Sequence, residues 1–448
     1  MRVIVSDIMK TKEVNRGLKV SLCIILFILS ILIMQLGDGS FRRTRSNLTI
    51  GVFSGSYWDV QNGNTYRILD DAIEKYEKKY PGIHVTYETG IVKSDYTEWL
   101  NEKIMSGSMP DVVFILGSDF SSLAEIGALK NLAALSGSDK IFTKEDYFSS
   151  AWESGKYAGK QYALPFECAP QLMFVNKTIL NREKIALPDA DWTWDEFYSI
   201  CKKVAHSSEE GNNQYGVTGY DWTCAFNADG VDFFSNGSEK VDFTVPSITD
   251  SLNLLEKLNE LNDGYQVSGA DFSDGNVAFQ PMPFSQYRAY KSQELRIKKY
   301  SGFEWSCLTM PAGPDGDNVS ELDTLCIGMS SSTNMEKEAW NFMKLLSADP
   351  EIQREILLYS DGLPVMRNVT LSDEAQELIE GDHENSLNME MLEQAIDHSV
   401  VTPRFRGYSG AKEQVDLAVR SILDGVSNIE TEQILWNREI NNYLQTIN

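Results

Sequence analysis

Short apolar segments alternate with amphipathic ones in the first part of the chain body. The runs 48–53, 83–87 and 111–116 are apolar and of strand length, whereas 66–80 and 96–105 repeat apolar residues at helical spacing. Strands joined by helices pair in parallel, because a parallel pair needs a long crossover connection. The order of these segments therefore predicts an α/β fold with a mainly parallel sheet and helices on both faces.

The rest of the chain predicts a second α/β unit and a helical end. Segments 161–164 and 171–175 are predicted to be two separate strands, and 194–204 is predicted to be a helix. Helical spacing dominates from residue 336 onward. A chain of 448 residues has room for two cores at roughly 150 residues per domain. We therefore expect two α/β units and a helical C-terminal region.

The acidic composition argues against nucleic acid as a partner. The formal net charge is -25, and no stripe of Lys and Arg with interleaved aromatic residues occurs. Hydrophobic residues at 42% and charged residues at 23% are ordinary values for a globular protein. We expect a soluble, monomeric body.

An apolar run near the N-terminus predicts export. Residues 20–36 carry no charge and follow a basic segment, residues 1–19, which is typical of a signal peptide or a transmembrane anchor. Cys23 lies at the start of the run, whereas a lipoprotein cysteine would follow a small residue at its end. We favour an uncleaved anchor on the extracellular face of the membrane, joined to the body by a linker at 37–47. Secretion after cleavage is the alternative.

No motif for catalysis, cofactor binding or metal binding stands out. The histidines are not paired at metal-ligand spacing, and no dinucleotide, phosphate-loop or CxxC motif occurs. The acidic stretch from Asp315 to Asp323 lacks the EF-hand register, so we favour a solvated turn, with a calcium site as the alternative. We expect no catalytic residue, no cofactor and no metal. A glycoside hydrolase pair of carboxylates stays open, since sequence spacing does not reveal it.

Aromatic and acidic side chains follow the predicted strands. Tyr57 and Trp58 come after the first strand, Asp119 after the third, and Asp221 with Trp222 after a strand of the second unit. Ligands of open parallel sheets bind beyond the carboxyl ends of the strands. A sugar offers an apolar C–H face to aromatic rings and hydroxyls to carboxylates. These residues therefore predict a carbohydrate site.

Other conspicuous residues have structural interpretations. Asp119 could instead cap a helix beginning near Ser121. Trp305 lies inside a predicted strand and is expected in the core. The cysteines of the body show no disulfide spacing and are expected to be small buried residues: Cys168, Cys201, Cys224, Cys307 and Cys326.

Eight segments, in this order, carry a resemblance to a known family: 109–114 (MPDVVF), 126–132, 159–165 (GKQYALP), 174–177, 192–197 (WTWDEF), 310–316 (MPAGPDG), 339–346 and 362–364. From about residue 48 to the C-terminus, the chain resembles the extracellular solute-binding proteins of sugar-type ABC importers, the maltose-binding-protein type (bacterial extracellular solute-binding protein family 1). The absence of a lipoprotein cysteine departs from many such proteins.

The resemblance implies a periplasmic-binding-protein type II fold with two lobes. The N-terminal lobe would comprise 48–167 plus 282–321, and the C-terminal lobe 168–281 plus 322–448. The crossings between them would lie near Glu167, Met282 and Glu321. The ligand would be held in the cleft between the lobes.

The resemblance also implies ligand contacts and partners. The contacts carried over are Tyr57, Trp58, Asp119 and Glu167, followed by Asp221, Trp222, Phe284, Asp323 and Arg367. The implied function is delivery of a sugar or oligosaccharide to the permease subunits of an ABC importer, without catalysis. A sensory ectodomain that signals to a histidine kinase and a surface glycoside hydrolase are the competing interpretations.

Overall fold

The computed structural model describes residues 46–60, 63–64, 66–139, 143–206, 213–234, 239–294, 302–380, 387–425 and 428–447. Its contacts form two compact units, Leu48–Lys78 with Val85–Asn448, and Met1–Asn47 with Lys79–His84. All sites considered below belong to the first unit. The predicted basic segment 1–19, the predicted anchor 20–36 and most of the predicted linker 37–47 lie outside the described residues. Within the described ranges, no helix combines the length and the apolar character needed to cross a bilayer.

The predicted alternation of strands and helices is confirmed in the first part of the body. The elements in order are β1 (Ser46–Gly51), α2 (Arg67–Lys79), β2 (Ile83–Tyr87), α3 (Lys93–Met105), β3 (Val112–Ile115) and α4 (Gly117–Glu125). Strand β1 begins two residues earlier than predicted, at Ser46. Strands β1 and β3 pair in parallel, as their helical crossover requires.

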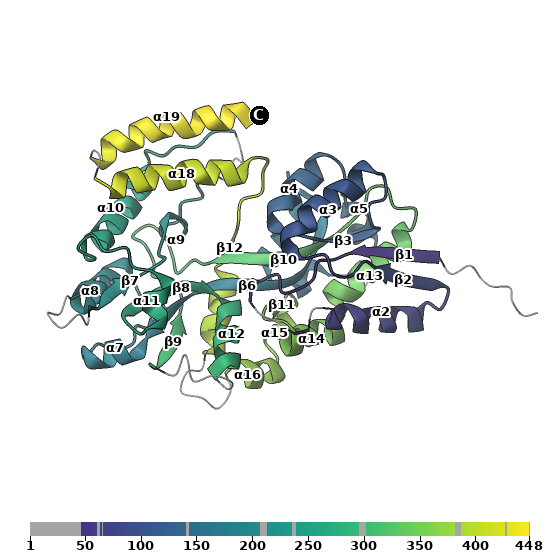
Figure 1. Cartoon of the computed structure of the whole chain (residues 1–448), viewed down its shortest axis with the longest axis horizontal. Helices are drawn as coiled ribbons and strands as arrows, with labels where there is room; N and C mark the ends of the chain where they lie inside the picture. The colour runs from purple at the N-terminus through teal and green to yellow at the C-terminus, as the bar shows by residue number, and fades with distance from the viewer. Residues whose placement is uncertain are drawn as a thin grey trace, which may run out of the picture. The chain divides into compact units, whose positions relative to one another are not determined.

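The sheet is mixed, so the prediction of a mainly parallel sheet is wrong. Its strand order is β2-β1-β3-β10-β6-β8-β7, and Figure 1 shows β6 and β10 side by side at its middle. Strand β10 (Glu321–Met329) runs antiparallel to both β3 and β6. Strand β8 (Val277–Pro283) is antiparallel to β6 and parallel to β7 (Tyr215–Val217). The order of elements predicted the crossovers correctly, but it could not reveal that late strands return to the middle of the sheet.

Strand β6 (Ala163–Asn176) is shared by the two halves of the sheet. Its residues 163–170 pair with β10, and 171–176 pair with β8 and β9 (Trp305–Leu308). The sequence predicted two separate strands here. They form one strand because a bulge accommodates Pro165: Glu167 lies opposite Leu325 and Pro165 opposite Cys326, which leaves Phe166 as the extra residue.

Helices lie on both sides of the strands in Figure 1, with α3, α4 and α18 (Tyr408–Leu423) on one side and α12 (Phe284–Glu294) and α14 (Pro350–Tyr359) on the other. The remaining helices are α5 (Ala133–Ser138), α6 (Ser149–Glu153), α7 (Lys177–Arg182), α8 (Trp194–Val204), α9 (Trp222–Ala228), α10 (Pro246–Glu260), α11 (Gly269–Ser273), α13 (Glu336–Ala348), α15 (Arg367–Thr370), α16 (Asp373–Ile379), α17 (Met389–Asp397) and α19 (Ile429–Ile447). Short strands are β4 (Lys156–Tyr157), β5 (Lys160–Gln161), β11 (Leu363–Pro364) and β12 (Val400–Val401). The predicted helical C-terminal region is confirmed.

The core follows the sequence interpretation. Trp305 is 1% exposed and stacks on Phe174 with ring centres 5.6 Å apart, so its predicted place in the core is confirmed. The five cysteines of the described body are all buried and free, as the interpretation as small buried residues requires.

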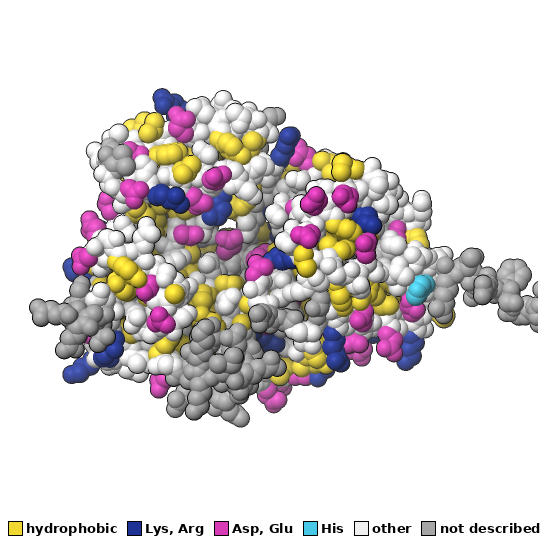
Figure 2. All heavy atoms as spheres, in the orientation of Figure 1, with side chains coloured by type: hydrophobic (Ala, Val, Ile, Leu, Met, Phe, Trp, Pro, Cys, Tyr) yellow, Lys and Arg dark blue, Asp and Glu magenta, His cyan; other side chains and the backbone are white. Residues whose placement is uncertain are grey.

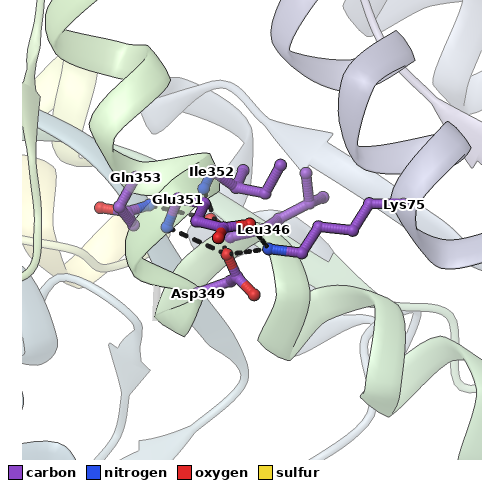
Figure 3. Close-up of polar contacts among 6 residues, drawn as sticks. All are labelled: Lys75, Leu346, Asp349, Glu351, Ile352 and Gln353. Carbon is purple, nitrogen blue, oxygen red and sulfur yellow. Dashed lines mark hydrogen bonds and ion pairs between the residues drawn. The ribbon is translucent and has the colours of Figure 1, made fainter. Parts of the chain in front are cut away.

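The start of α14 ties α2 to the sheet (Figure 3). Asp349 caps α14 by accepting from the backbone N–H of Glu351 and Ile352, and Lys75 of α2 pairs with Asp349 at 2.7 Å and with Glu351 at 2.6 Å. One turn further, the buried Gln353 side chain donates to the backbone carbonyls of Leu346 and Phe166 at 2.8 and 2.9 Å. The backbone carbonyl of Phe166, the bulge residue of β6, therefore has a hydrogen-bond partner inside the protein.

Candidate functional site

A cavity of about 510 Å³ opens where the ends of β1 and β8 and the start of β10 approach the segment before α18. Figure 2 shows acidic side chains gathered in the hollow beneath α18. Its lining residues are Tyr57, Trp58, Asp59, Lys93, Leu116, Gly117, Ser118, Pro283, Ser285, Glu321, Asp323, Thr402, Pro403, Arg404, Tyr408 and Ser409. Three residues of the sequence prediction, Tyr57, Trp58 and Asp323, therefore line one cavity.

Tyr57 and Asp323 form a fixed pair in this cavity. The Tyr57 hydroxyl donates to the Asp323 carboxylate at 3.0 Å, while the Lys93 ammonium lies 5.0 Å from the Tyr57 ring centre and pairs with Asp59 at 2.8 Å. Burial raises the pKa of Tyr57 well above its ordinary value, and the Asp323 charge adds to this effect. Solvent in the cavity reaches Asp323, yet the surrounding protein still raises the pKa of its carboxyl by desolvation. Tyr57 therefore stays protonated as a donor to Asp323.

The Glu167 carboxylate and the Trp58 indole nitrogen both lie close to Gly362, and the indole nitrogen is buried with no hydrogen-bond partner among the described residues. The Trp58 ring packs edge-on against Tyr57 with centres 4.8 Å apart and is only 7% exposed. Glu167 of β6 is 5% exposed, lines a separate small cavity of about 70 Å³ and accepts a hydrogen bond from the Ser360 hydroxyl. Burial raises the pKa of Glu167 to about 7, against the opposing effect of Ser360 and the Trp58 indole. Glu167 thus supports the wall of the large cavity without lining it.

The structure adds cavity residues that the sequence reasoning missed: Lys93, Ser285, Arg404 and Tyr408. Arg404 lies 4.8 Å above the Phe120 ring, and its charge opposes the rise in the pKa of Asp323. Ser285 is fully buried at the start of α12, and its hydroxyl has no hydrogen-bond partner among the described residues. None of these residues directly follows a predicted strand, which is why the strand-end rule did not find them.

A second cavity of about 340 Å³ adjoins the first and contains Trp222. The two cavities share four lining residues, which are Glu321, Thr402, Pro403 and Tyr408. Trp222 begins α9, is 5% exposed, and donates its indole N–H to Asp416 at 2.6 Å. It therefore belongs both to the core and to the wall of this cavity.

Two predicted acidic residues lie at helix starts. Asp119 is the third residue of α4 and accepts a hydrogen bond from the Thr97 hydroxyl at 2.7 Å. The alternative that it caps a helix beginning near Ser121 is wrong, because α4 already begins at Gly117. Asp221 is exposed and caps α9 through the backbone N–H of Thr223. Neither carboxylate lines the two large cavities.

Phe284 and Arg367 also lie outside the lining of these cavities. Phe284 is fully buried and stacks on Tyr287 with centres 5.6 Å apart. Arg367 begins α15 and pairs with Glu393 and Asp397. Across the described ranges, no group of three or more His, Cys, Asp or Glu is arranged to hold a metal ion.

Solved structures assign the fold. The sugar-binding protein MalE from Xanthomonas citri superposes with a TM-score of 0.73 at 15% sequence identity, covering 90% of this chain and 98% of that one. The chain therefore has the α/β periplasmic-binding-protein fold, as predicted, with a mixed sheet flanked by helices.

Sequence relatives assign the family. Residues 71–380 match the profile described as bacterial extracellular solute-binding protein, and the chain belongs to this family of binding proteins. A maltotriose-binding protein of Pyrococcus abyssi is 21% identical over 401 residues, covering 84% of this chain and 79% of the relative. An uncharacterized lipoprotein in the oleD 5' region of Streptomyces antibioticus is 23% identical over 299 residues. This second match covers 62% of the present chain and 62% of the Streptomyces protein, so the chain spans less than two thirds of the length of that relative.

Proposed function

We propose that the chain is the substrate-binding component of an ABC importer and that it holds a sugar or oligosaccharide in the 510 Å³ cavity. The observation that carries this proposal is the convergence of Tyr57 and Trp58 with Asp323 and Arg404 in one cavity. Aromatic faces pack on the C–H faces of sugar rings, and charged groups form strong hydrogen bonds with hydroxyls.

The proposed motion joins two lobes, 48–167 plus 282–321 and 168–281 plus 322–448. These bounds come from the resemblance, and the sheet pairing divides within β6 in a different way: residues 163–170 pair with β10, which also pairs with β3, whereas residues 171–176 pair with β8 and β9. The cavity takes lining residues from both proposed lobes. Ligand would therefore favour a closed form in which both sets of contacts are made, and a permease would recognise that form.

The relatives support the ligand class and the location. The Pyrococcus relative is named a maltotriose-binding protein, and the Streptomyces relative is named a lipoprotein. We propose that this chain is held at the extracellular face of the membrane through residues 20–36, which is the role that the sequence predicts for this run.

Calorimetric titration of the full-length chain with a panel of neutral oligosaccharides tests the binding. We expect one sugar to bind with micromolar affinity or better and to raise the melting temperature by several degrees, because ligand binds only the folded state. Trp58→Ala should weaken binding by about tenfold or more, because it removes a stacking face. The matched control is Trp99→Ala, which removes a Trp of α3 outside the cavity lining and should leave affinity unchanged.

Two results would overturn the proposal. One is a folded chain that binds no sugar of the panel at millimolar concentration. The other is equal affinity in Trp58→Ala and the unaltered chain. Transport is tested separately: deletion of the chain, with the permease intact, should abolish uptake of the sugar that it binds.

A further inference from the structure

The second cavity differs in chemistry from the first. Its walls include the aromatic rings of Trp222, Phe226, Phe233, Phe234 and Tyr408. The Trp222 and Phe226 rings meet edge to face with centres 5.2 Å apart, and Phe226 meets Phe233 in the same way at 5.7 Å. The cavity thus presents a large aromatic surface beside the more polar site.

The charged side chains that line the second cavity are all acidic. Asp232 and Glu321 line it, and its described lining residues include no Lys or Arg. The Glu321 carboxylate accepts a hydrogen bond from the Thr402 hydroxyl, and burial together with the charges of Asp323 and Asp221 raises its pKa. A hydroxyl donor brings no positive charge to offset that of the carboxylate.

One cation among the described residues already lies against these aromatic walls. Lys412 lies 5.3 Å from the Trp222 ring centre and pairs with Asp416 at 3.3 Å. Neither Lys412 nor Asp416 lines the cavity. The charge of Lys412 opposes the rise in the pKa of Glu321, but desolvation outweighs it, and desolvation also raises the pKa of Asp232.

We propose that the second cavity receives a positively charged, amine-bearing part of the ligand, so that the site prefers an aminated oligosaccharide to its neutral counterpart. This inference rests on the proposed function and specifies its ligand. An ammonium group is attracted to aromatic faces, most strongly to Trp. It also offsets the cost of withdrawing the two carboxylates from water when ligand fills the cavity, a cost that a neutral ligand leaves unmet.

The shared wall gives such a ligand a continuous path. Glu321, Thr402, Pro403 and Tyr408 border both cavities. Sugar rings in the first cavity would contact Tyr57 and Trp58, while an amine at the end of the same molecule would reach Glu321. One ligand could thus satisfy both sets of groups.

The experiment compares matched probes on the full-length chain by calorimetry at low ionic strength. The first pair is maltotriose aminated at its reducing end and maltotriitol. The second pair is the glucosamine trimer and its N-acetylated form. We expect at least one pair to show about tenfold tighter binding of the amine, a difference set by one added charge contact.

Substitutions test whether the preference for the amine arises in the second cavity. Glu321→Gln and Asp232→Asn should each reduce the ratio of amine to neutral affinity toward one. Glu336→Gln removes the same charge from α13, where Glu336 pairs with Lys130, and should leave the ratio unchanged. A ratio that falls equally in Glu336→Gln would assign the effect to net charge and overturn the proposal.

The outcomes separate this inference from the proposed function. Equal affinity for both members of each pair overturns the inference and leaves the proposed function standing. Failure of all four probes, while another neutral sugar binds, has the same meaning. If no sugar of any kind binds the folded chain, both are overturned.

Discussion

A single methyl group at position 362 should disturb the candidate site. Gly362 precedes β11 and packs so closely that an added Cβ would lie 2.7 Å from the Trp58 indole nitrogen and 2.9 Å from the Glu167 carboxylate. Contacts below 3 Å force an atom to move. Glu167 is buried and bonded to Ser360, so we expect the Trp58 ring to shift toward the open cavity.

The magnitude follows from two opposed effects. Overpacking a close-packed interior costs about 1 to 3 kcal/mol. Replacing Gly by Ala restricts the unfolded chain and returns about 0.4 to 1 kcal/mol. Gly362→Ala should therefore lower the free energy of unfolding by roughly 0.5 to 2 kcal/mol. Displacement of the stacking ring should weaken sugar binding by about tenfold.

Urea denaturation and calorimetric titration measure the two effects. The matched control is Gly137→Ala in α5, because a Cβ at Gly137 meets nothing within 4 Å. That variant should be as stable as the unaltered chain, or more stable by about 0.5 to 1 kcal/mol, with unchanged affinity. Unchanged stability and affinity in Gly362→Ala would refute the argument that Gly362 holds Trp58 in place.

Three further predictions concern stability. Burial raises the pKa of Glu167 from 4.5 to about 7, so the stability that its protonated form contributes is fully present below pH 4.5 and is lost between pH 4.5 and 7. The free energy of unfolding of Glu167→Gln should therefore rise relative to that of the unaltered chain across this range, by up to about 3 kcal/mol, and a difference in urea midpoint that does not change with pH would contradict this. Asp349→Ala removes both a helix cap and an ion pair (Figure 3) and should lower the free energy of unfolding by about 1 to 2 kcal/mol. Lys75→Met removes the ion pair alone and should lower it by under about 1 kcal/mol, and by less at high salt; equal losses in the two variants would show that the cap contributes nothing. Trp222→Ala should lower stability by about 3 to 5 kcal/mol, because the ring is buried and bonded to Asp416; a fully stable variant would show that Trp222 serves ligand alone.

The sequence predicted the local elements better than their pairing. Helical spacing and apolar runs located α2, α3 and the strands around them, because one buried face leaves a periodic trace. Strand β6 left no such trace, since nearly all of its residues are buried on both faces. Its bulge at Phe166 depends on partners in β10 and on Gln353 of α14, which no local pattern contains.

The candidate site was predictable only where it follows strands. Tyr57 and Trp58 come after β1, so the strand-end rule found them. Asp323 lies 266 residues from its partner Tyr57 and was found through the family resemblance. Arg404 follows the two-residue strand β12, which is too short to produce a sequence signal. Long-range pairing, and not residue chemistry, limited the prediction.

The register of β6 and β10 explains why the site accumulates negative charge. Glu167 lies opposite Leu325, and side chains alternate along a strand, so Glu321, Asp323 and Glu167 share one face of the sheet. Each carboxylate accepts a hydrogen bond from a neutral hydroxyl, of Thr402, Tyr57 and Ser360 respectively. Hydroxyl donors satisfy geometry but do not cancel charge, so desolvation raises the pKa of all three carboxyls. Lys93 and Arg404 oppose the charge of Asp323 in the first cavity, whereas the described lining of the second cavity beside Glu321 includes no Lys or Arg. A ligand that brings hydroxyl donors to Asp323 and a cation to Glu321 would therefore offset the desolvation of both carboxylates.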